Sequence, residues 1–134
     1  MLNEVGKPAV QSGRLALGCI EIARDWGYAG DFVWAMWRML QEPTPTDLVL
    51  GTGVPHSLAD LCKTAYQSVG CDWSQCIISD PSLVRPLESG QTLANPTRAR
   101  ELLNWKLSTS FDAMIRKMVE AQIRRLEGKS RSHA

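Results

Sequence analysis

Residues 15–40 read LALGCIEIARDWGYAGDFVWAMWRML and contain two apolar runs that differ in length. The first run, 15–20, is short and interrupted by glycine, which is typical of a buried strand. The second run, 31–41, has an acidic residue at its start and Pro43 just beyond its end, so it predicts a helix. Because Arg38 is the only polar residue in its interior, we expect this helix to be buried nearly all round.

The rest of the chain continues to alternate between strand and helix patterns. A helix is indicated where Ser57 stands three residues before Asp60 in the manner of a capping box, and Gly70 marks its end. The elements predicted outside the opening stretch are a strand at 48–50, a helix at 57–70, a strand at 76–78, a helix at 95–105 and a helix at 111–126. We therefore predict an α/β fold with a small sheet of about three strands and four helices.

Length and composition indicate a single core. With 134 residues, of which 44% are hydrophobic and 22% charged, the chain is too short for two ordinary domains. We expect an irregular N-terminal arm over residues 1–13, one domain over 14–127 and a disordered tail over 128–134. A three-stranded sheet is small for a free-standing α/β domain, so part of the expected architecture is missing.

The charge balance excludes several classes of partner. Fifteen basic residues nearly balance fourteen acidic ones, and the net charge of +1 gives no broad field to attract nucleic acid or lipid headgroups. No apolar stretch approaches the roughly 20 residues of a membrane helix, and residues 1–10 lack the pattern of a signal peptide. We expect a cytoplasmic protein with neither nucleic-acid nor membrane partners.

Few residues suggest catalysis or metal binding. The four cysteines have no zinc-type spacing and are expected to be reduced: Cys19, Cys62, Cys71 and Cys76. His56 and His133 have no evident nucleophile or acidic partner nearby in the sequence. No Gly-x-Gly-x-x-Gly turn follows a predicted strand. We predict no catalytic residue, no metal site and no cofactor in this chain.

Two arginines lie in segments between the predicted elements, where ligands are usually bound. Arg24 precedes Asp25-Trp26-Gly27, and Arg85 precedes Pro86-Leu87-Glu88. Two guanidinium groups from separate loops would suit a diphosphate, and Glu88 could accept hydrogen bonds from ribose hydroxyls. A structural role is equally consistent with the pattern, because Arg24 could pair with Asp25 or with a carbonyl group.

At these same residues the chain resembles the GDP-mannose 4,6-dehydratases, members of the extended short-chain dehydrogenase family. The resemblance runs from about residue 14 to residue 126. The motifs that carry it, in order, are Arg24-Asp25-Trp26-Gly27, Gly51-Thr52-Gly53, Val69-Gly70-Cys71-Asp72-Trp73, Arg85-Pro86 with Glu88, Asn95-Pro96-Thr97-Arg98-Ala99 and Leu103-Asn104-Trp105-Lys106.

The resemblance implies that Arg24 and Arg85 contact the diphosphate of GDP-mannose and that Glu88 contacts its ribose. In that family the reaction removes water from the mannose ring with the help of bound NADP, and the cofactor site and catalytic residues lie in an N-terminal part. This chain matches only the C-terminal, substrate-binding part, so the resemblance implies a protein that is inactive alone.

Three hypotheses about function follow. The chain is the substrate-binding portion of a dehydratase-like protein that binds a GDP-sugar. Alternatively, it is an interaction module, in which helix 31–41 associates with a second copy or with another protein that covers it. In the third hypothesis it is one subunit of a dehydratase assembled from two polypeptides.

Overall fold

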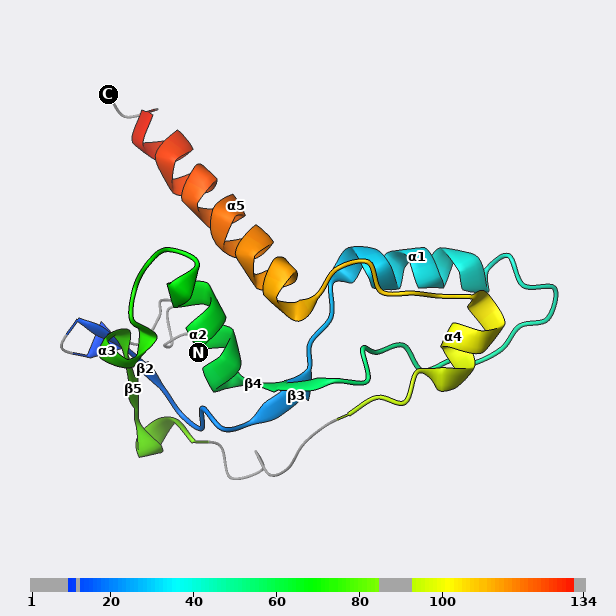
Figure 1. Ribbon diagram of the computed structural model, residues 1–134, viewed down its shortest axis with the longest axis horizontal. Helices are drawn as coiled ribbons and strands as arrows, with labels where there is room; N and C mark the ends of the chain where they lie inside the picture. The colour runs from blue at the N-terminus through cyan, green and yellow to red at the C-terminus, as the bar shows by residue number, and fades with distance from the viewer. Residues whose placement is uncertain (1–9, 12, 85–92, 132–134) are drawn as a thin grey trace. The chain divides into compact units, whose positions relative to one another are not determined.

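The computed structural model describes residues 10, 11, 13–84 and 93–131 of the chain. Short strands lie mostly in the first two thirds of this length, and helices occur among them and after them, as the ribbon shows (Figure 1). The elements are β1 (Val10–Gln11), β2 (Arg14–Leu17), β3 (Ala23–Asp25), α1 (Ala29–Met39), β4 (Pro55–Ser57), α2 (Leu58–Gln67), α3 (Trp73–Cys76), β5 (Ile77–Ser79), the 3-10 turn η1 (Pro81–Leu83), α4 (Thr97–Leu103) and α5 (Phe111–Arg131). The α/β prediction is confirmed.

The chain forms two compact units, where the sequence predicts one domain over 14–127. The first unit combines residues 1–24 with 56–91, and the second combines 25–55 with 92–134. Each unit has its own cluster of buried apolar side chains. The two units are therefore described separately.

The first unit is built on a three-stranded sheet in the order β1-β2-β5. β2 runs parallel to β5, with Leu15 opposite Ile77 and Leu17 opposite Ser79. β1 pairs antiparallel with β2, so two residues of the predicted N-terminal arm belong to the sheet. Helix α2 covers this sheet through Cys62, which packs with Leu17 and Ile77 in the core of the unit.

Local sequence signals account well for α2. The Ser57 hydroxyl accepts a hydrogen bond from the Asp60 amide at 3.0 Å, and the Asp60 carboxylate accepts from the Ser57 amide at 2.9 Å. This reciprocal capping box satisfies amide groups that the first turn of a helix cannot satisfy internally. The predicted helix start at Ser57 is confirmed, as is the short strand beginning near Cys76.

One predicted strand is wrong. Residues 48–50 form no strand, and Leu48 and Leu50 instead pack from an irregular segment against the core of the second unit. A short apolar run shows that its residues are buried but does not show how, because a strand also needs a neighbour to pair with. The strand that forms nearby is β4, which pairs with β3 in a separate two-stranded sheet.

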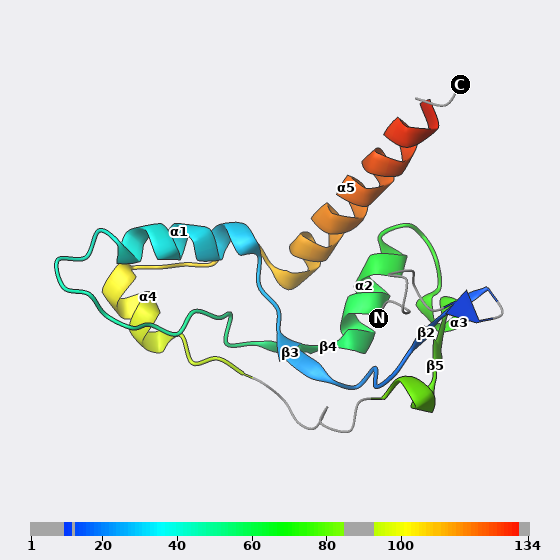
Figure 2. The ribbon, with the colours of Figure 1, turned by 180° about the vertical axis from the view of Figure 1, so that it is seen from behind.

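Helices α1 and α4 form the core of the second unit, and both ribbon views place them side by side (Figures 1 and 2). Ala35 from α1 packs with Ala99 and Leu103 from α4 and with Trp105, which follows α4. The ring of Phe32 lies at a centroid distance of 5.7 Å from the ring of Trp105. Trp105 and Leu103 are the largest side chains in the core with almost no exposed surface.

The prediction that helix 31–41 is buried nearly all round is wrong for this chain. Only Asp31 and Ala35 of α1 are buried, whereas several of its large apolar side chains are exposed. The sequence pattern indicates how apolar the helix is, but burial on all sides also requires neighbouring elements on every side. Among the described residues, α1 has packing neighbours on one side only, the side of Ala35.

Helix α4 is two residues shorter than predicted at each end, whereas α5 begins where it was predicted and ends later. Asn104 ends α4 in the left-handed conformation, with a φ of 48°. The Ser110 hydroxyl accepts a hydrogen bond from the Ala113 amide at 3.3 Å and so caps α5 as predicted. α5 continues to Arg131, beyond the predicted helix end at residue 126 and into the stretch predicted to be a disordered tail.

Candidate functional site

Arg24 is the one predicted site residue that the structure describes. It lies in β3 and its side chain is half-buried. Its Nη1 atom donates a hydrogen bond to the carbonyl oxygen of Ala23 at 2.8 Å. This local bond is one of the structural roles expected for the residue, and it holds part of the guanidinium group against its own strand. Arg85 and Glu88 lie outside the described residues, so the two-arginine clamp stays a prediction.

The neighbouring residue, Asp25, gathers hydrogen bonds from distant parts of the second unit. Its carboxylate accepts from the Thr52 amide at 2.8 Å, the Thr52 hydroxyl at 2.5 Å, the Gly53 amide at 2.9 Å and the Ala94 amide at 3.3 Å. Burial by itself would raise the pKa of Asp25, but the hydrogen bonds from Thr52, Gly53 and Ala94 outweigh it, so the pKa lies below its ordinary value. Asp25 therefore joins its own strand to two other segments of the chain, one at Thr52 and Gly53 and one at Ala94.

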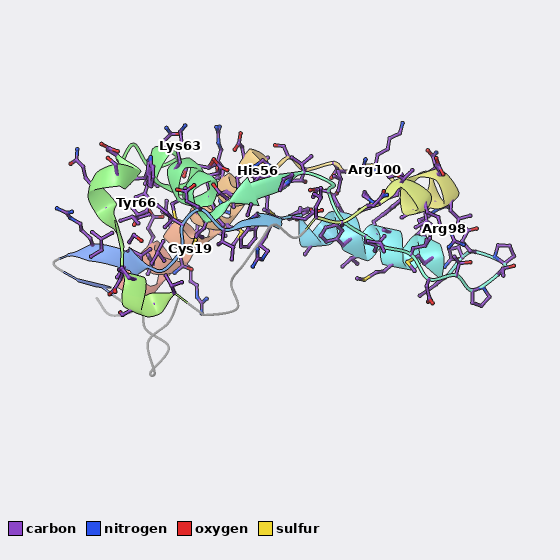
Figure 3. All side chains as sticks on the ribbon, turned by 90° about the horizontal axis from the view of Figure 1, so that it is seen from below. Cys19, His56, Lys63, Tyr66, Arg98 and Arg100 are labelled. Atoms are coloured by element: carbon purple, nitrogen blue, oxygen red, sulfur yellow. The ribbon has the colours of Figure 1, made fainter. Side chains whose placement is uncertain are left out.

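The glycines around Thr52 allow this close approach. A Cβ atom on Gly51 would lie 2.2 Å from the Ala94 Cβ and 2.8 Å from a carboxylate oxygen of Asp25. Gly53 has a φ of +72°, which side chains rarely adopt. Arg100, on α4 in Figure 3, donates from Nη2 to the Thr52 carbonyl oxygen at 2.6 Å. The Gly51-Thr52-Gly53 motif thus has a structural explanation.

A second carboxylate, that of Asp31, is buried and fixes the start of α1. It accepts hydrogen bonds from the Ser108 amide at 3.1 Å, the Ser108 hydroxyl at 2.5 Å and the Thr109 amide at 3.1 Å. The Asp31 carbonyl oxygen accepts from the indole N–H of Trp105 at 3.0 Å. The acidic residue that the sequence suggested as a helix start therefore joins α1 to the segment between α4 and α5.

Among the titratable groups that the structure describes, no nucleophile stands out. Burial raises the pKa of the Cys62 thiol and of the Tyr66 hydroxyl, so both stay protonated at neutral pH. All four cysteines are free thiols. Within the described ranges, no three side chains of His, Cys, Asp or Glu gather as a metal site requires. The same ranges contain no helix that is both long and apolar enough to span a bilayer.

The described residues that follow β2 also do not fit a dinucleotide cofactor. Gly18 follows β2 directly, where a phosphate-binding loop would begin, but a Cβ atom on it would lie 2.6 Å from the carbonyl oxygen of Leu83. This glycine therefore makes room for a neighbouring chain segment instead of opening toward a ligand. No step of any reaction is assigned to a cofactor in this chain.

The sequence did not single out Asp25, Asp31 or Trp105 for any such role. Each of the two carboxylates bonds to segments between 27 and 78 residues away in the chain. Such pairings leave no periodic signal, because they depend on how the chain folds back on itself. The nearest hint was the pair of glycines flanking Thr52, since a glycine often marks a close approach of backbone segments.

The arrangement of helices and short strands is similar to part of the fold of several solved epimerases and dehydratases. The chain superposes with a TM-score of 0.72 on a UDP-glucose 4-epimerase from Thermotoga maritima solved with UDP-glucose, at 22% identity over 84% of this chain and 36% of that one. It superposes with a TM-score of 0.71 on RMD from Pseudomonas aeruginosa complexed with NADPH, at 19% identity over 82% of this chain and 36% of that one. These likenesses establish the fold.

Sequence comparison identifies the family. A profile of the GDP-mannose 4,6 dehydratase family matches residues 5–118. Over 110 residues the chain is 34% identical to GDP-mannose 4,6 dehydratase 1 of Arabidopsis thaliana, covering 82% of this chain and 30% of that protein. Over 125 residues it is 33% identical to the human GDP-mannose 4,6 dehydratase, covering 81% of this chain and 34% of that protein. The chain belongs to the GDP-mannose 4,6 dehydratase family, as the motifs predicted, and spans about a third of the length of these relatives.

Proposed function

We propose that this chain is the substrate-binding portion of a GDP-mannose 4,6-dehydratase-like protein and that it binds a GDP-sugar without catalysing dehydration by itself. The observation that carries the proposal is the family match over residues 5–118, which includes the Arg24-Asp25-Trp26-Gly27 motif and the predicted ligand residues Arg85 and Glu88. In the proposed site, Arg24 and Arg85 bind diphosphate oxygens and Glu88 accepts hydrogen bonds from ribose hydroxyls.

The position of Arg24 supports this assignment. Arg24 Nη1 is held against the Ala23 carbonyl, so the guanidinium group starts from a restricted position and loses less freedom when an anion binds. Asp25 beside it has its carboxylate occupied by donors from Thr52, Gly53 and Ala94. A neighbouring carboxylate that is satisfied elsewhere competes less with a phosphate for the arginine.

The proposed lack of catalysis rests on what the chain can hold. Dehydration with internal oxidation and reduction needs a nicotinamide beside the sugar, and Gly18 does not form a phosphate cradle. The described residues also show no activated nucleophile. A complete reaction would require the roughly two thirds of the relatives' length that this chain does not span.

Calorimetric titration of the chain with GDP-mannose, and separately with GDP, tests binding. We expect a Kd in the micromolar to low-millimolar range, weakened at least tenfold in Arg24→Ala and in Arg85→Ala. Arg98→Ala is the matched control, because Arg98 is an exposed arginine on α4 (Figure 3). The proposal fails if millimolar ligand gives no heat, or if Arg98→Ala weakens binding as much as the two test variants do.

We also propose a second candidate function, in which the chain supplies the region that it shares with its relatives to a polypeptide that lacks that region. Mixing the chain with a relative from which the matching portion has been deleted should restore consumption of GDP-mannose in the presence of NADP. Mixing it with an Arg24→Ala version should restore much less. No consumption in a mixture that forms a stable complex would count against this candidate.

We also propose a cytoplasmic location for this binding function. The four free cysteines support it, since cysteines of secreted proteins are usually paired. Fusing the chain to a redox-sensitive fluorescent reporter in the source cell would test the location directly. A reporter in its oxidised form would contradict the proposal.

A further inference from the structure

The residue that follows β2, Gly18, lies against the backbone of the turn η1. A Cβ atom on Gly18 would lie 2.6 Å from the carbonyl oxygen of Leu83, 2.9 Å from its carbonyl carbon and 3.2 Å from the amide nitrogen of Val84. Because all three are backbone atoms, they cannot rotate aside as the end of a flexible side chain can. Gly18 is not among the glycines with a positive φ, so this position requires a glycine for space and not for conformation.

Hydrogen bonds hold the two segments together beside this close approach. The Asp80 amide donates to the Leu17 carbonyl oxygen at 2.7 Å. The Ser79 hydroxyl donates to the Gly18 carbonyl oxygen at 3.0 Å. These bonds extend the parallel pairing of β2 with β5, in which Leu17 lies opposite Ser79. The close approach therefore rests on residues of the first unit alone.

The turn η1 is bonded internally as well. The Asp80 carboxylate accepts hydrogen bonds from the Ser82 amide at 2.9 Å and from the Ser82 hydroxyl at 2.7 Å. The Leu83 amide donates to the Asp80 carbonyl oxygen at 3.0 Å. The Val84 amide donates to the Pro81 carbonyl oxygen at 3.2 Å. A displacement of Leu83 should therefore carry Val84 with it.

Arg85 is the next residue after Val84 in the chain. A planar peptide bond joins the two residues, so a shift of Val84 changes the point from which Arg85 extends. Restoring an ordinary contact between an alanine Cβ at position 18 and the Leu83 oxygen needs a shift of about 0.5–1 Å. A shift of this size matters to a guanidinium group, because its paired hydrogen bonds to phosphate oxygens depend on distance and angle.

We propose that Gly18 is a positioning residue for sugar-nucleotide binding: it lets η1 approach β2, and this approach sets the place from which Arg85 extends toward the diphosphate. The inference rests on the proposed function, since it requires Arg85 to bind the diphosphate. Gly18 acts through Arg85 and touches no ligand itself.

Titration of GDP followed by its phosphorus NMR signals tests the proposal in a double-mutant cycle. We expect Gly18→Ala to weaken GDP binding by about five- to tenfold when Arg85 is present, and by less than about twofold in the Arg85→Ala background, where the displaced group is absent. A purely structural role of Gly18 predicts equal losses in the two backgrounds.

Gly70→Ala is the matched control within the same unit. Gly70 has a φ of +73° and open space around its Cβ position, so alanine strains the backbone there without touching Leu83. This variant should leave the Kd for GDP within about twofold of the wild type. Thermal unfolding verifies that each variant is folded at the temperature of the titration.

Ser79→Ala gives a milder perturbation if Gly18→Ala does not fold. It removes only the hydroxyl that bonds to the Gly18 carbonyl, and it should weaken GDP binding about two- to threefold, again only when Arg85 is present. A folded Gly18→Ala that binds GDP as tightly as the wild type overturns the inference, as does Ser79→Ala in its place. Equal losses with and without Arg85 also overturn it. A wild-type chain that does not bind GDP overturns the proposed function and this inference together.

Discussion

Replacing Asp31 with alanine should destabilise the second unit strongly. The substitution removes a buried carboxylate that accepts three hydrogen bonds from Ser108 and Thr109, and it leaves the bond from Trp105 to the backbone carbonyl in place. A hydrogen bond to a charged acceptor contributes about 1.5–3 kcal/mol. The three bonds share one acceptor and are not additive, and the freed donors regain some solvation because Ser108 is exposed.

We therefore expect Asp31→Ala to lower the free energy of unfolding by about 2–4 kcal/mol, a large share of the 5–15 kcal/mol typical of a domain. Urea denaturation at pH 7 followed by tryptophan fluorescence measures the loss. Four of the five tryptophans belong to the second unit, so the signal reports mainly on that unit. With a slope near 1–2 kcal/mol per molar urea, the midpoint should fall by roughly 1–4 M.

Asp47→Ala provides the control, because Asp47 is an exposed aspartate in the same unit and should change stability by less than about 0.5 kcal/mol. A double-mutant cycle with Ser108→Ala should show a coupling energy of about 1 kcal/mol or more. If Asp31→Ala shifts the midpoint no further than the control does, or if the cycle shows no coupling, the stabilising role assigned to Asp31 is refuted.

Three further predictions concern stability. The pKa of Asp25 is lowered in the folded chain. The contribution of its carboxylate to stability should therefore be complete above the ordinary aspartate pKa of about 3.9 and be lost as the pH falls through the folded pKa. Acid titrations monitored by fluorescence should show this loss of stability, and the Asp25→Asn variant should not show it. Gly51→Ala should lower the melting temperature by roughly 5 °C or more, because the new methyl group would overlap Ala94 and the Asp25 carboxylate; an unchanged melting temperature would contradict the geometry. Leu103→Ala should cost about 2–5 kcal/mol in urea denaturation, whereas Leu102→Ala, which truncates a 44% exposed side chain on the same helix, should cost less than about 1 kcal/mol.

Much of the fold could be predicted where a signal is local. The capping box at Ser57 and Asp60 fixes the start of α2 because both partners lie within one helical turn. The start of α5 at Ser110 is of the same kind. The residues 48–50 show the limit, since their apolar pattern correctly marks contact with a core but does not supply a strand partner.

The burial of α1 could not be predicted from its sequence. Its residues are apolar on nearly every side, and the pattern carries no information on which side a neighbour will cover. The structure shows that the side of Ala35 faces the core and the side of Leu40 does not. Which face of an apolar helix stays exposed depends on the elements that pack against the helix, so it can be seen only in the structure.

The Arg24-Asp25-Trp26-Gly27 motif combines two roles that sequence similarity alone does not separate. Asp25 is explained by the fold, because it joins segments 27 to 69 residues away, and Gly27 is explained by its close approach to the Phe32 ring. A match to this motif would therefore persist in a chain that kept the fold and lost the ligand. Arg24 is the motif residue on which the ligand hypothesis depends. The two substitutions should therefore affect different quantities. Arg24→Ala should weaken GDP-mannose binding with little effect on the free energy of unfolding, whereas Asp25→Ala should mainly lower the free energy of unfolding.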